Sequence, residues 1–362
     1  MRLEFKKRAA PSRVATWLAP VAAFALTLAT GALIFLSLGK DPVAGLYYFF
    51  VEPLTVAWSL EELVVKMIPL ALIAVGLCIC FLSSTWNIGA EGQFIVGALA
   101  GSSVPILAPW LDGPAMLPLM LLAGFAGGMA YGLIPATLKV RFGANEILTS
   151  LMLVYVAELL LDWLVRGPWR NPDGFNMPES APFPASGRVP AMPFMDVDRL
   201  TIAIIITVAA AIIVQFVLSR TLFGYSVRVG GIAPRAARFA GFDANRTVLW
   251  ALGLSGGFAG LAGILEVAGP IGQLRPAISP GYGFTAIIVA FLARLSPIGC
   301  LAAAFVLSLT YIGGEGAQIA MGLSDKMARV FQGILLFFAL VCDAFVFYRV
   351  RLVTARTGAA PS

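Results

Sequence analysis

The chain has 362 residues, of which 59% are hydrophobic and only 12% charged, and its formal net charge is +6. A soluble domain carries roughly 25% charged residues, so this chain has too little polar surface for water, and we expect lipid to surround much of it. It has no histidine, which excludes the commonest general base and the commonest metal ligand. The composition therefore favours an integral membrane protein and argues against an enzyme.

Ten apolar runs along the chain are candidates for transmembrane helices. A helix that crosses about 30 Å of hydrocarbon needs roughly 20 predominantly apolar residues at 1.5 Å each. The runs that meet or approach this length are residues 14–38, 62–82, 88–108, 115–138, 146–165, 200–219, 247–268, 282–295, 297–319 and 329–348. The eighth run is short, so we expect a half-helix or a re-entrant segment that is buried in protein.

The fold class that follows is all-α, a polytopic helical membrane bundle with about ten transmembrane segments. A basic tail, residues 1–13, precedes a single transmembrane domain, residues 14–348, and a short tail, residues 349–362, follows it. The basic start resembles a signal peptide, but the first apolar run is longer than the apolar core of such a peptide. We interpret this run as a retained first helix.

The basic residues indicate how the bundle is oriented. With ten crossings and the N-terminus inside, most of the 25 Lys and Arg residues lie on the inner side. Inner loops of membrane proteins carry an excess of Lys and Arg. An odd number of crossings would place the basic stretch Arg349–Arg356 outside, against this trend. We therefore expect both termini to be cytoplasmic.

Two connections are longer than a turn between helices requires. The outer connection, residues 166–199, is rich in Pro and Gly and reads as a surface loop. The inner connection, residues 220–246, has five Arg against one Asp, and within it a helix-compatible stretch runs from Pro234 to Ala240 and is closed by Gly241. Pro at a helix start and Gly past its end are the usual pattern. A basic connection that serves only to keep the loop on the inner side would not need a helix, so this predicted helix indicates a further role.

Small residues recur at four-residue spacing in the fourth and seventh predicted spans. Such faces let helix backbones approach closely in lipid, so we expect a compact bundle. The residues are Gly124, Gly128 and Gly132 in the fourth span, and Gly253, Gly256, Gly257 and Gly260 in the seventh.

Polar side chains at membrane depth are costly and are therefore candidates for function. The densest group opens the third span, where Asn87, Glu91 and Gln93 supply hydrogen-bond donors and acceptors beside two glycines. Two interpretations remain open for them, a hydrogen-bonded helix start or direct contact with a transported substrate.

Other polar residues have simpler interpretations. Asn145, with Glu146 after it, is predicted to cap the fifth span, although Asn145 is also a candidate for the substrate path. Acids toward the outer ends of spans are expected to be solvated or paired; they are Glu158, Asp162, Glu266 and Glu315.

The chain shows no motif for catalysis or nucleotide binding. It lacks the Gly-x-x-x-x-Gly-Lys-Ser/Thr loop, so it cannot bind ATP in the P-loop manner, and ATP-driven transport would need an ATPase on another polypeptide. Its cysteines all lie in apolar runs, where we expect packed thiols without a disulfide or a metal. They are Cys78, Cys80, Cys300 and Cys342.

Three motifs of this chain resemble the permease subunits of simple-sugar and nucleoside ABC importers. They are Asn87-Ile-Gly-Ala-Glu-Gly-Gln-Phe94, Gly143-Ala-Asn-Glu-Ile-Leu-Thr-Ser-Leu-Met-Leu153 and Gly231-Ile-Ala-Pro-Arg-Ala-Ala-Arg-Phe-Ala-Gly241. The resemblance covers about residues 60–348. The first two motifs look closest to the branch that serves nucleoside receptors of the basic-membrane-protein type. The Pro-rich connection 166–199 does not align with that pattern, which leaves the identity of the receptor open.

The resemblance implies partners and a coupling site. The partners are a cytoplasmic ATP-binding subunit, a homologous second permease and an extracytoplasmic substrate-binding lipoprotein, besides membrane lipid. ATP and Mg would be bound by the ATPase, so this chain is expected to bind no cofactor, and no nucleic acid is implied. The inner helix matches the place where such permeases insert a coupling helix into the ATPase, and its candidate residues are Pro234, Arg235, Ala237, Arg238 and Gly241.

We therefore expect a non-catalytic permease that imports nucleosides across the inner membrane of a bacterium. A permease for a simple sugar such as ribose would need similar polar groups and remains open. A stand-alone ion-coupled transporter is a more distant alternative, because histidine is absent and carboxylates are scarce at mid-membrane.

Overall fold

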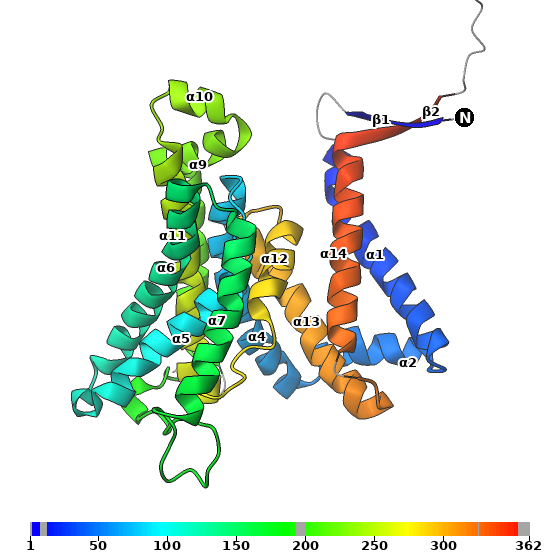
Figure 1. Ribbon diagram of the computed structural model, residues 1–362. Coiled ribbons are helices and arrows are strands. Elements are labelled where there is room, and N and C mark those ends of the chain that lie inside the picture. Colours follow the sequence, from blue (N-terminus) through cyan, green and yellow to red (C-terminus); the bar gives the residue numbers. More distant parts are fainter. Residues whose placement is uncertain (1, 8–12, 193–199, 325, 354–362) are drawn as a thin grey trace, which may run out of the picture. The chain divides into compact units, whose positions relative to one another are not determined.

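Figure 1 shows the computed structural model of the chain, which describes residues 2–7, 13–192, 200–324 and 326–353. The chain forms two compact units. The central unit is Pro53–Ile312, and the terminal unit combines Met1–Glu52 with Gly313–Ser362.

The central unit is a helical bundle. Its α-helices are α4 (Ala57–Leu82), α5 (Ala90–Leu107), α6 (Met116–Phe142), α7 (Glu146–Arg166), α8 (Ala203–Arg220), α9 (Leu222–Ile232), α10 (Pro234–Phe239), α11 (Ala244–Glu266) and α12 (Tyr282–Leu292). Short turns of other helix types are η2 (Pro109–Leu111), η3 (Ala185–Gly187) and η4 (Val267–Ile271). Helix α13 (Pro297–Met321) begins in this unit and ends in the terminal one, and α3 (Glu52–Thr55) lies at the other boundary.

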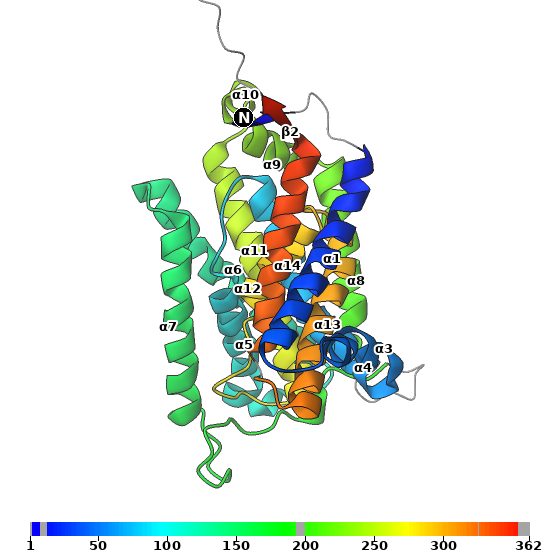
Figure 2. The ribbon, with the colours of Figure 1, turned by 90° about the vertical axis from the view of Figure 1, so that its right-hand side faces the viewer.

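The terminal unit joins the two ends of the chain. It contains β1 (Arg2–Lys7), α1 (Arg13–Ser37), α2 (Pro42–Leu46), η1 (Tyr47–Val51), α14 (Met327–Phe347) and β2 (Tyr348–Val353). Helices α1 and α14 lie side by side (Figure 2). The core of this unit is aromatic, because the rings of Phe49 and Phe331 lie 4.4 Å apart and Phe35 packs against both.

The all-α fold class is confirmed, since each of the ten predicted runs coincides with a helix and the only strands in the described chain are the short β1 and β2. Over the described residues, seven helices are long and apolar enough to cross a membrane, and Val21–Ser37, Tyr282–Leu292 and Arg329–Cys342 are shorter apolar stretches. The eighth run is a short helix, as expected. The 11 residues of α12 extend about 16 Å, roughly half of the hydrocarbon thickness.

Local sequence signals set the ends of several helices. Gly143 ends α6 in the left-handed conformation, with φ of 67°, which glycine adopts at little cost. Asn145 then caps α7, because its side-chain oxygen accepts a hydrogen bond from the Ile147 N–H at 2.9 Å. The predicted cap is therefore confirmed.

One region of helix was not predicted. Residues 42–55, between the first two predicted runs, form α2, η1 and α3. Asp41 accepts a hydrogen bond from the Val43 N–H at 2.9 Å, and Pro42 takes the first helical position. Both are ordinary start signals, but a search for runs of about 20 apolar residues passes over helices this short.

The terminal strands are a second addition to the predicted fold. Strands β1 and β2 pair antiparallel, with Arg2 opposite Val353, where the sequence suggested only basic tails. Of those tails, residues 8–12 and 354–362 lie outside the described residues. The pairing brings the two ends of the described chain together. Their cytoplasmic location stays a prediction.

Glycine allows α5, α6 and α11 to pack at backbone contact. A Cβ atom added to Gly128 of α6 would overlap the Gly256 carbonyl oxygen of α11, and one added to Gly97 of α5 would overlap the backbone of Gly260. The small face predicted in the fourth span and the Gly256–Gly260 pair of the seventh are therefore confirmed as close-packing surfaces. We call α5, α6 and α11 the glycine triplet.

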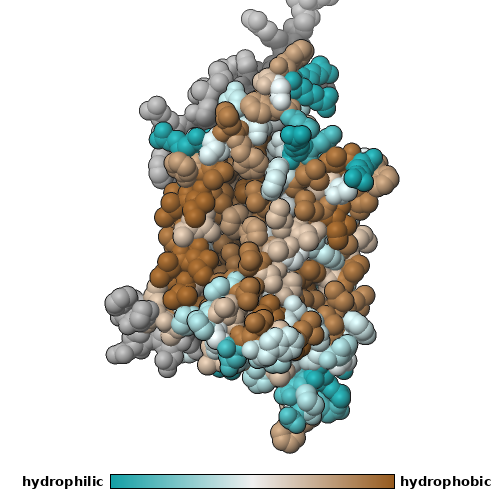
Figure 3. Space-filling view, turned by 90° about the vertical axis from the view of Figure 1, so that its left-hand side faces the viewer, coloured by the Kyte–Doolittle hydropathy of each residue, from teal (hydrophilic) through white to brown (hydrophobic). Residues whose placement is uncertain are grey.

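The outer surface of the bundle matches a lipid environment. Figure 3 shows one face on which hydrophobic side chains cover the middle and hydrophilic side chains gather at the two ends. Leu122 and Ile134 on α6 are among the large apolar residues that are exposed. An apolar band between polar ends is the pattern of a membrane-spanning bundle.

Candidate functional site

Two interrupted connections meet where α5 and α12 begin. Residues 83–89, here called the 83–89 segment, run without helix from the end of α4 to α5, and residues 272–281 lead from η4 to α12. The Gly283 N–H of α12 donates a hydrogen bond to Glu91 Oε2 of α5 at 2.6 Å. A helix N-terminus attracts a carboxylate, and a side chain at Gly283 would overlap the Glu91 backbone. Glu91 is therefore held at the junction of two helix starts.

Beside this junction lies a cavity of about 450 Å³. This volume falls in the usual range for small-molecule sites, roughly 300–1,000 Å³. Helices α5 and α7 and the connection before α12 form its walls. The cavity, called the α5–α7 cavity, is lined by Glu91, Ile95, Tyr155, Glu158, Leu159, Leu161, Asp162, Pro276, Ala277, Ile278 and Ser279.

The lining of the α5–α7 cavity mixes acids and a phenol with apolar side chains. Asp162 is paired with Arg166 at 2.7 Å, one turn along α7, as predicted for an acid near a span end. Ser279 accepts hydrogen bonds from the N–H groups of Gly281 and Tyr282, just before and at the start of α12. Such a wall can hold an uncharged solute through hydroxyl and carboxylate hydrogen bonds on one side and apolar contact on the other.

Asn87 and Gln93 face each other rather than the cavity lining. The Asn87 Nδ2 group donates to Gln93 Oε1 at 2.7 Å and to Ser255 Oγ at 3.0 Å, and Gln93 Nε2 donates to Asn87 Oδ1 at 3.0 Å. All three side chains are buried. These bonds support the helix-start interpretation, and a role of Asn87, Gln93 and the exposed Asn145 in a substrate path stays a prediction. Of the four candidates, Glu91 lines the cavity.

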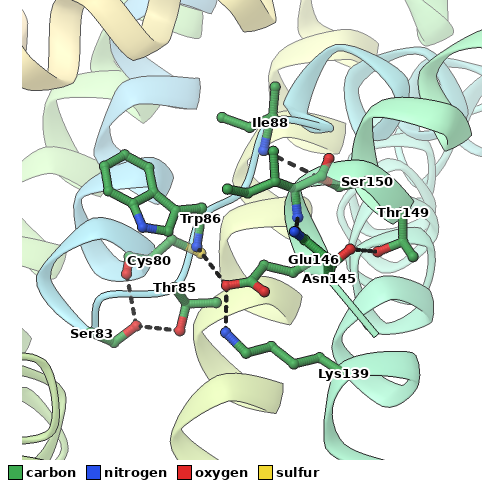
Figure 4. A network of polar contacts seen from close by, with 11 residues as sticks. Cys80, Ser83, Thr85, Trp86, Ile88, Lys139, Asn145, Glu146, Thr149 and Ser150 are labelled. Carbon is green, nitrogen blue, oxygen red and sulfur yellow. Dashed lines mark hydrogen bonds and ion pairs between the residues drawn. The ribbon is translucent and has the colours of Figure 1, made fainter. Parts of the chain in front are cut away.

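A polar network joins the 83–89 segment to the start of α7 (Figure 4). The Trp86 N–H donates to Glu146 Oε1 at 3.5 Å, and the Ile88 N–H donates to Ser150 Oγ at 3.3 Å. Glu146 is also paired with Lys139 of α6. The sequence indicates Glu146 only as a first-turn acid. Its partner Lys139 is seven residues away and on another helix, and Trp86 is 60 residues away.

One end of the central unit carries α9 and α10 (Figure 1), and its cytoplasmic location stays a prediction. The predicted helix is confirmed, since α10 begins at Pro234 and Gly241 follows it with φ of 81°. Ala237 is buried, whereas Arg235 and Arg238 are exposed and Phe239 is 95% exposed. Helix α10 thus presents two cations and an aromatic ring to its surroundings, and its role in coupling to an ATPase stays a prediction.

The Pro-rich connection at the other end of the central unit is fastened to the segment after α11. The N–H groups of Ser180 and Phe183 donate to the carbonyls of Leu274 and Gly272 at 3.0 and 2.9 Å. Glu179 is paired with Arg275 at 3.2 Å. Residues 167–192 are thus an ordered loop with one short helical turn, η3, and residues 193–199 lie outside the described residues.

The remaining candidate residues have packing roles. Glu266 Oε1 accepts a hydrogen bond from the Tyr282 hydroxyl at 3.4 Å, in line with the predicted pairing. The sulfur atoms of Cys78 and Cys300 lie 3.4 Å apart between α4 and α13, and both are free thiols. Among the described residues, no group of three or more His, Cys, Asp or Glu side chains is arranged to hold a metal ion.

Comparisons with known proteins point to one class. The family model for the permease component of branched-chain amino acid transport systems matches residues 59–340. A glucose ABC transporter permease of Haloferax volcanii is 36% identical over 95% of this chain and 93% of its own length. A nucleoside ABC transporter permease of Lactococcus lactis is 27% identical over 90% of each chain. A guanosine ABC transporter permease of Bacillus subtilis is 29% identical over 90% of this chain and 93% of its own length.

Proposed function

The chain belongs to the family of permease components of branched-chain amino acid transport systems, and from this membership we propose that it imports nucleosides as the membrane-spanning subunit of an ATP-binding-cassette transporter. The chain is a multi-pass ABC permease of the simple-sugar and nucleoside type. The proposal adds the direction, the cargo and a place in the inner membrane of a bacterium. Because the chain is an ABC permease, the alternative of a stand-alone ion-coupled transporter is set aside.

The α5–α7 cavity is the observation that carries the choice of a small uncharged solute. Its lining offers the carboxylates of Glu91 and Glu158 and the Tyr155 hydroxyl as hydrogen-bonding groups. Apolar side chains of Ile95 and Ile278 complete it. A nucleoside has a hydroxylated sugar and a flat base, which suit the polar and the apolar parts of such a wall respectively. Two relatives named for nucleoside or guanosine transport support this cargo.

A simple sugar is the second candidate, and a specific observation favours it. The relative that is 36% identical is named for glucose transport. A sugar would use the same carboxylates and the same tyrosine, because its hydroxyl groups are donors and acceptors like those of a ribose ring. The two cargoes therefore differ in whether a base must fit against the apolar part of the wall.

The two ends of the central unit offer surfaces for the partners that membership of this family implies. Helix α10 exposes Arg235 and Arg238. On the proposed cytoplasmic side, these cations would suit an acidic groove of a separate ATPase that binds and hydrolyses ATP with Mg²⁺. The ordered loop 167–192 offers a surface at the opposite end for a substrate-binding lipoprotein. A second, homologous permease would complete the membrane part. Docking outside and ATP-driven closure inside would shift a two-state bundle between outward- and inward-facing forms.

Uptake into liposomes tests the cargo directly. The complete transporter, with the second permease, the ATPase and the binding protein, is reconstituted and supplied with radiolabelled guanosine, adenosine, ribose or glucose. We expect ATP-dependent uptake of the two nucleosides, and none with an ATPase variant that binds but does not hydrolyse ATP. Uptake of ribose or glucose without any nucleoside uptake would contradict the nucleoside proposal and establish the sugar alternative.

A further inference from the structure

The inner helices α9 and α10 rest directly on the start of the 83–89 segment. A Cβ atom added to Gly231, near the end of α9, would overlap the Leu82 carbonyl oxygen that ends α4. The Ser84 hydroxyl donates a hydrogen bond to the Gly231 carbonyl at 3.0 Å. Ser84 has a left-handed backbone, with φ of 54°, which is uncommon for a residue other than glycine. This contact is both close-packed and hydrogen-bonded.

Helices α9 and α10 are joined so closely that they form one body. A single residue, Ala233, separates them, and its N–H donates to the Val229 carbonyl at 2.8 Å while its carbonyl accepts from the Ala237 N–H at 3.0 Å. Ala237 is buried and also accepts a hydrogen bond from the Phe242 N–H at 3.0 Å. A displacement of α10 therefore reaches Gly231.

The other end of the 83–89 segment is fastened to α7 and continues into α5. The Ile88 N–H bonds to Ser150 Oγ, and a Cβ added to Gly89 would lie 2.6 Å from the Ser150 carbonyl oxygen. Ser150 itself is buried. Glu146 receives the Trp86 N–H one turn earlier on α7, and α5 begins at Ala90. The segment thus touches α9 at one end and both helix walls of the α5–α7 cavity at the other.

We propose that the 83–89 segment passes movement of α9 and α10 to α5 and α7, with Gly231 and Ser150 as the positioning residues at its two ends. This inference rests on the proposed function, since it requires α10 to be moved by an ATPase. Its physical basis is a continuous chain of close contacts and hydrogen bonds that runs from α9 through the segment to α7 and α5. A loosened contact at either end would leave ATP hydrolysis running without moving the cavity walls.

The chain offers a matched pair of substitutions for the test. Gly231→Ala forces a Cβ against the Leu82 carbonyl, whereas Gly230→Ala, one residue earlier in the same helix, has no atom within 4 Å of the new Cβ. Alanine favours a helix over glycine equally at both positions. The measured quantity is the amount of solute imported per ATP hydrolysed by assembled transporter in liposomes, for whichever of guanosine, adenosine, ribose and glucose the wild type imports.

We expect Gly231→Ala to lower this ratio by about fivefold or more, the lower end of typical coupling between sites, while ATP hydrolysis continues. Gly230→Ala keeps the wild-type ratio. A purely structural role for Gly231 would reduce the yield of assembled complexes and leave the ratio per complex unchanged. An unchanged ratio in Gly231→Ala therefore overturns the proposal.

A second pair decides the matter if Gly231→Ala does not assemble. Ser150→Ala removes the hydroxyl that accepts the Ile88 N–H, whereas Thr149→Ala removes only a bond to the Asn145 carbonyl in the same helix. A lower ratio for Ser150→Ala alone supports the proposal, and a wild-type ratio for Ser150→Ala overturns it. A wild type that shows no ATP-driven uptake contradicts the proposed function itself, and both proposals then fail together.

Discussion

Asn87 has both polar atoms of its side chain engaged inside the protein. Its amide nitrogen donates to Gln93 and Ser255, and its oxygen accepts from Gln93 and from the Gly89 N–H. The oxygen and nitrogen of an amide are fully used by such a set. The group holds the end of the 83–89 segment against α11, which carries Ser255.

Replacing Asn87 by alanine should therefore cost stability rather than substrate affinity. Asn87→Ala removes the bonds that Asn87 makes with the buried side chains of Gln93 and Ser255. The cost should be about 1–3 kcal/mol, and we expect a lower melting temperature of the purified chain in detergent. The KM for uptake by the transporters that remain assembled should stay unchanged. Asn245→Ala, on the exposed first turn of α11, is the control. A raised KM with an unchanged melting temperature would place Asn87 in the substrate path.

The sequence identified Asn87, Glu91 and Gln93 as a polar group, but it could not show which of them is structural and which lines the cavity. Asn87, Glu91 and Gln93 are all conspicuous in an apolar run, yet the partners that decide their roles are far away along the chain. Ser255 is 168 residues from Asn87, and Gly283 is 192 residues from Glu91. Tyr155 was not identified at all, because a tyrosine in an apolar span is ordinary until the fold places it at a cavity.

Helix α10 shows what local signals can predict. Its first residue and its closing glycine were both evident, because Pro and Gly act through their own backbones. Helix α9 was missed, although Thr221 caps it by accepting a hydrogen bond from the Gly224 N–H at 3.2 Å. Thr221 follows the last residue of α8 directly, so the sequence shows no loop between α8 and α9 that would indicate the start of a second helix.

Reversing the charge of α10 should uncouple the permease from its ATPase. Arg235→Glu combined with Arg238→Glu would face an acidic groove with like charge, and such contacts cost several kcal/mol, so uptake should fall by about tenfold or more. Both side chains are exposed, so membrane insertion should be intact.

Arg246→Glu provides the control for this charge reversal, because Arg246 is also exposed but belongs to the first turn of α11. ATPase stimulation and co-purification of the ATPase are the measurements. Full stimulation in the double variant would refute the coupling role of α10.

At the scale of the whole molecule, the predicted orientation places α10 inside and the loop 167–192 outside. Phe175 in the loop 167–192 and Phe239 in α10 are 99% and 95% exposed. This loop and α10 lie at opposite ends of the central unit (Figure 1). A membrane-impermeant maleimide should label Phe175→Cys in intact cells and Phe239→Cys only after permeabilisation. The unchanged chain is the control, because its four cysteines are buried. Labelling of Phe239→Cys from outside would invert the topology.

The overall helix pattern was predictable because lipid imposes length and apolarity on each span. The division into a central and a terminal unit was not, since it depends on contacts between residues before Glu52 and after Gly313. The pairing of β1 with β2 joins segments more than 300 residues apart in the same way. Charge could indicate that both ends share a side, but it carries no information about backbone pairing.

The glycine triplet has a consequence for how the bundle can move. Where side chains separate two helices, rotamer changes let one helix slide past the other by small steps. In the triplet, the backbones of Gly128, Gly256 and Gly260 are in direct contact, so no side chain lies between them to absorb such a shift. We therefore expect α5, α6 and α11 to move together as one rigid body. Helix α7 lies outside this triplet, at the edge of the bundle in Figure 2, so relative displacement is left to it.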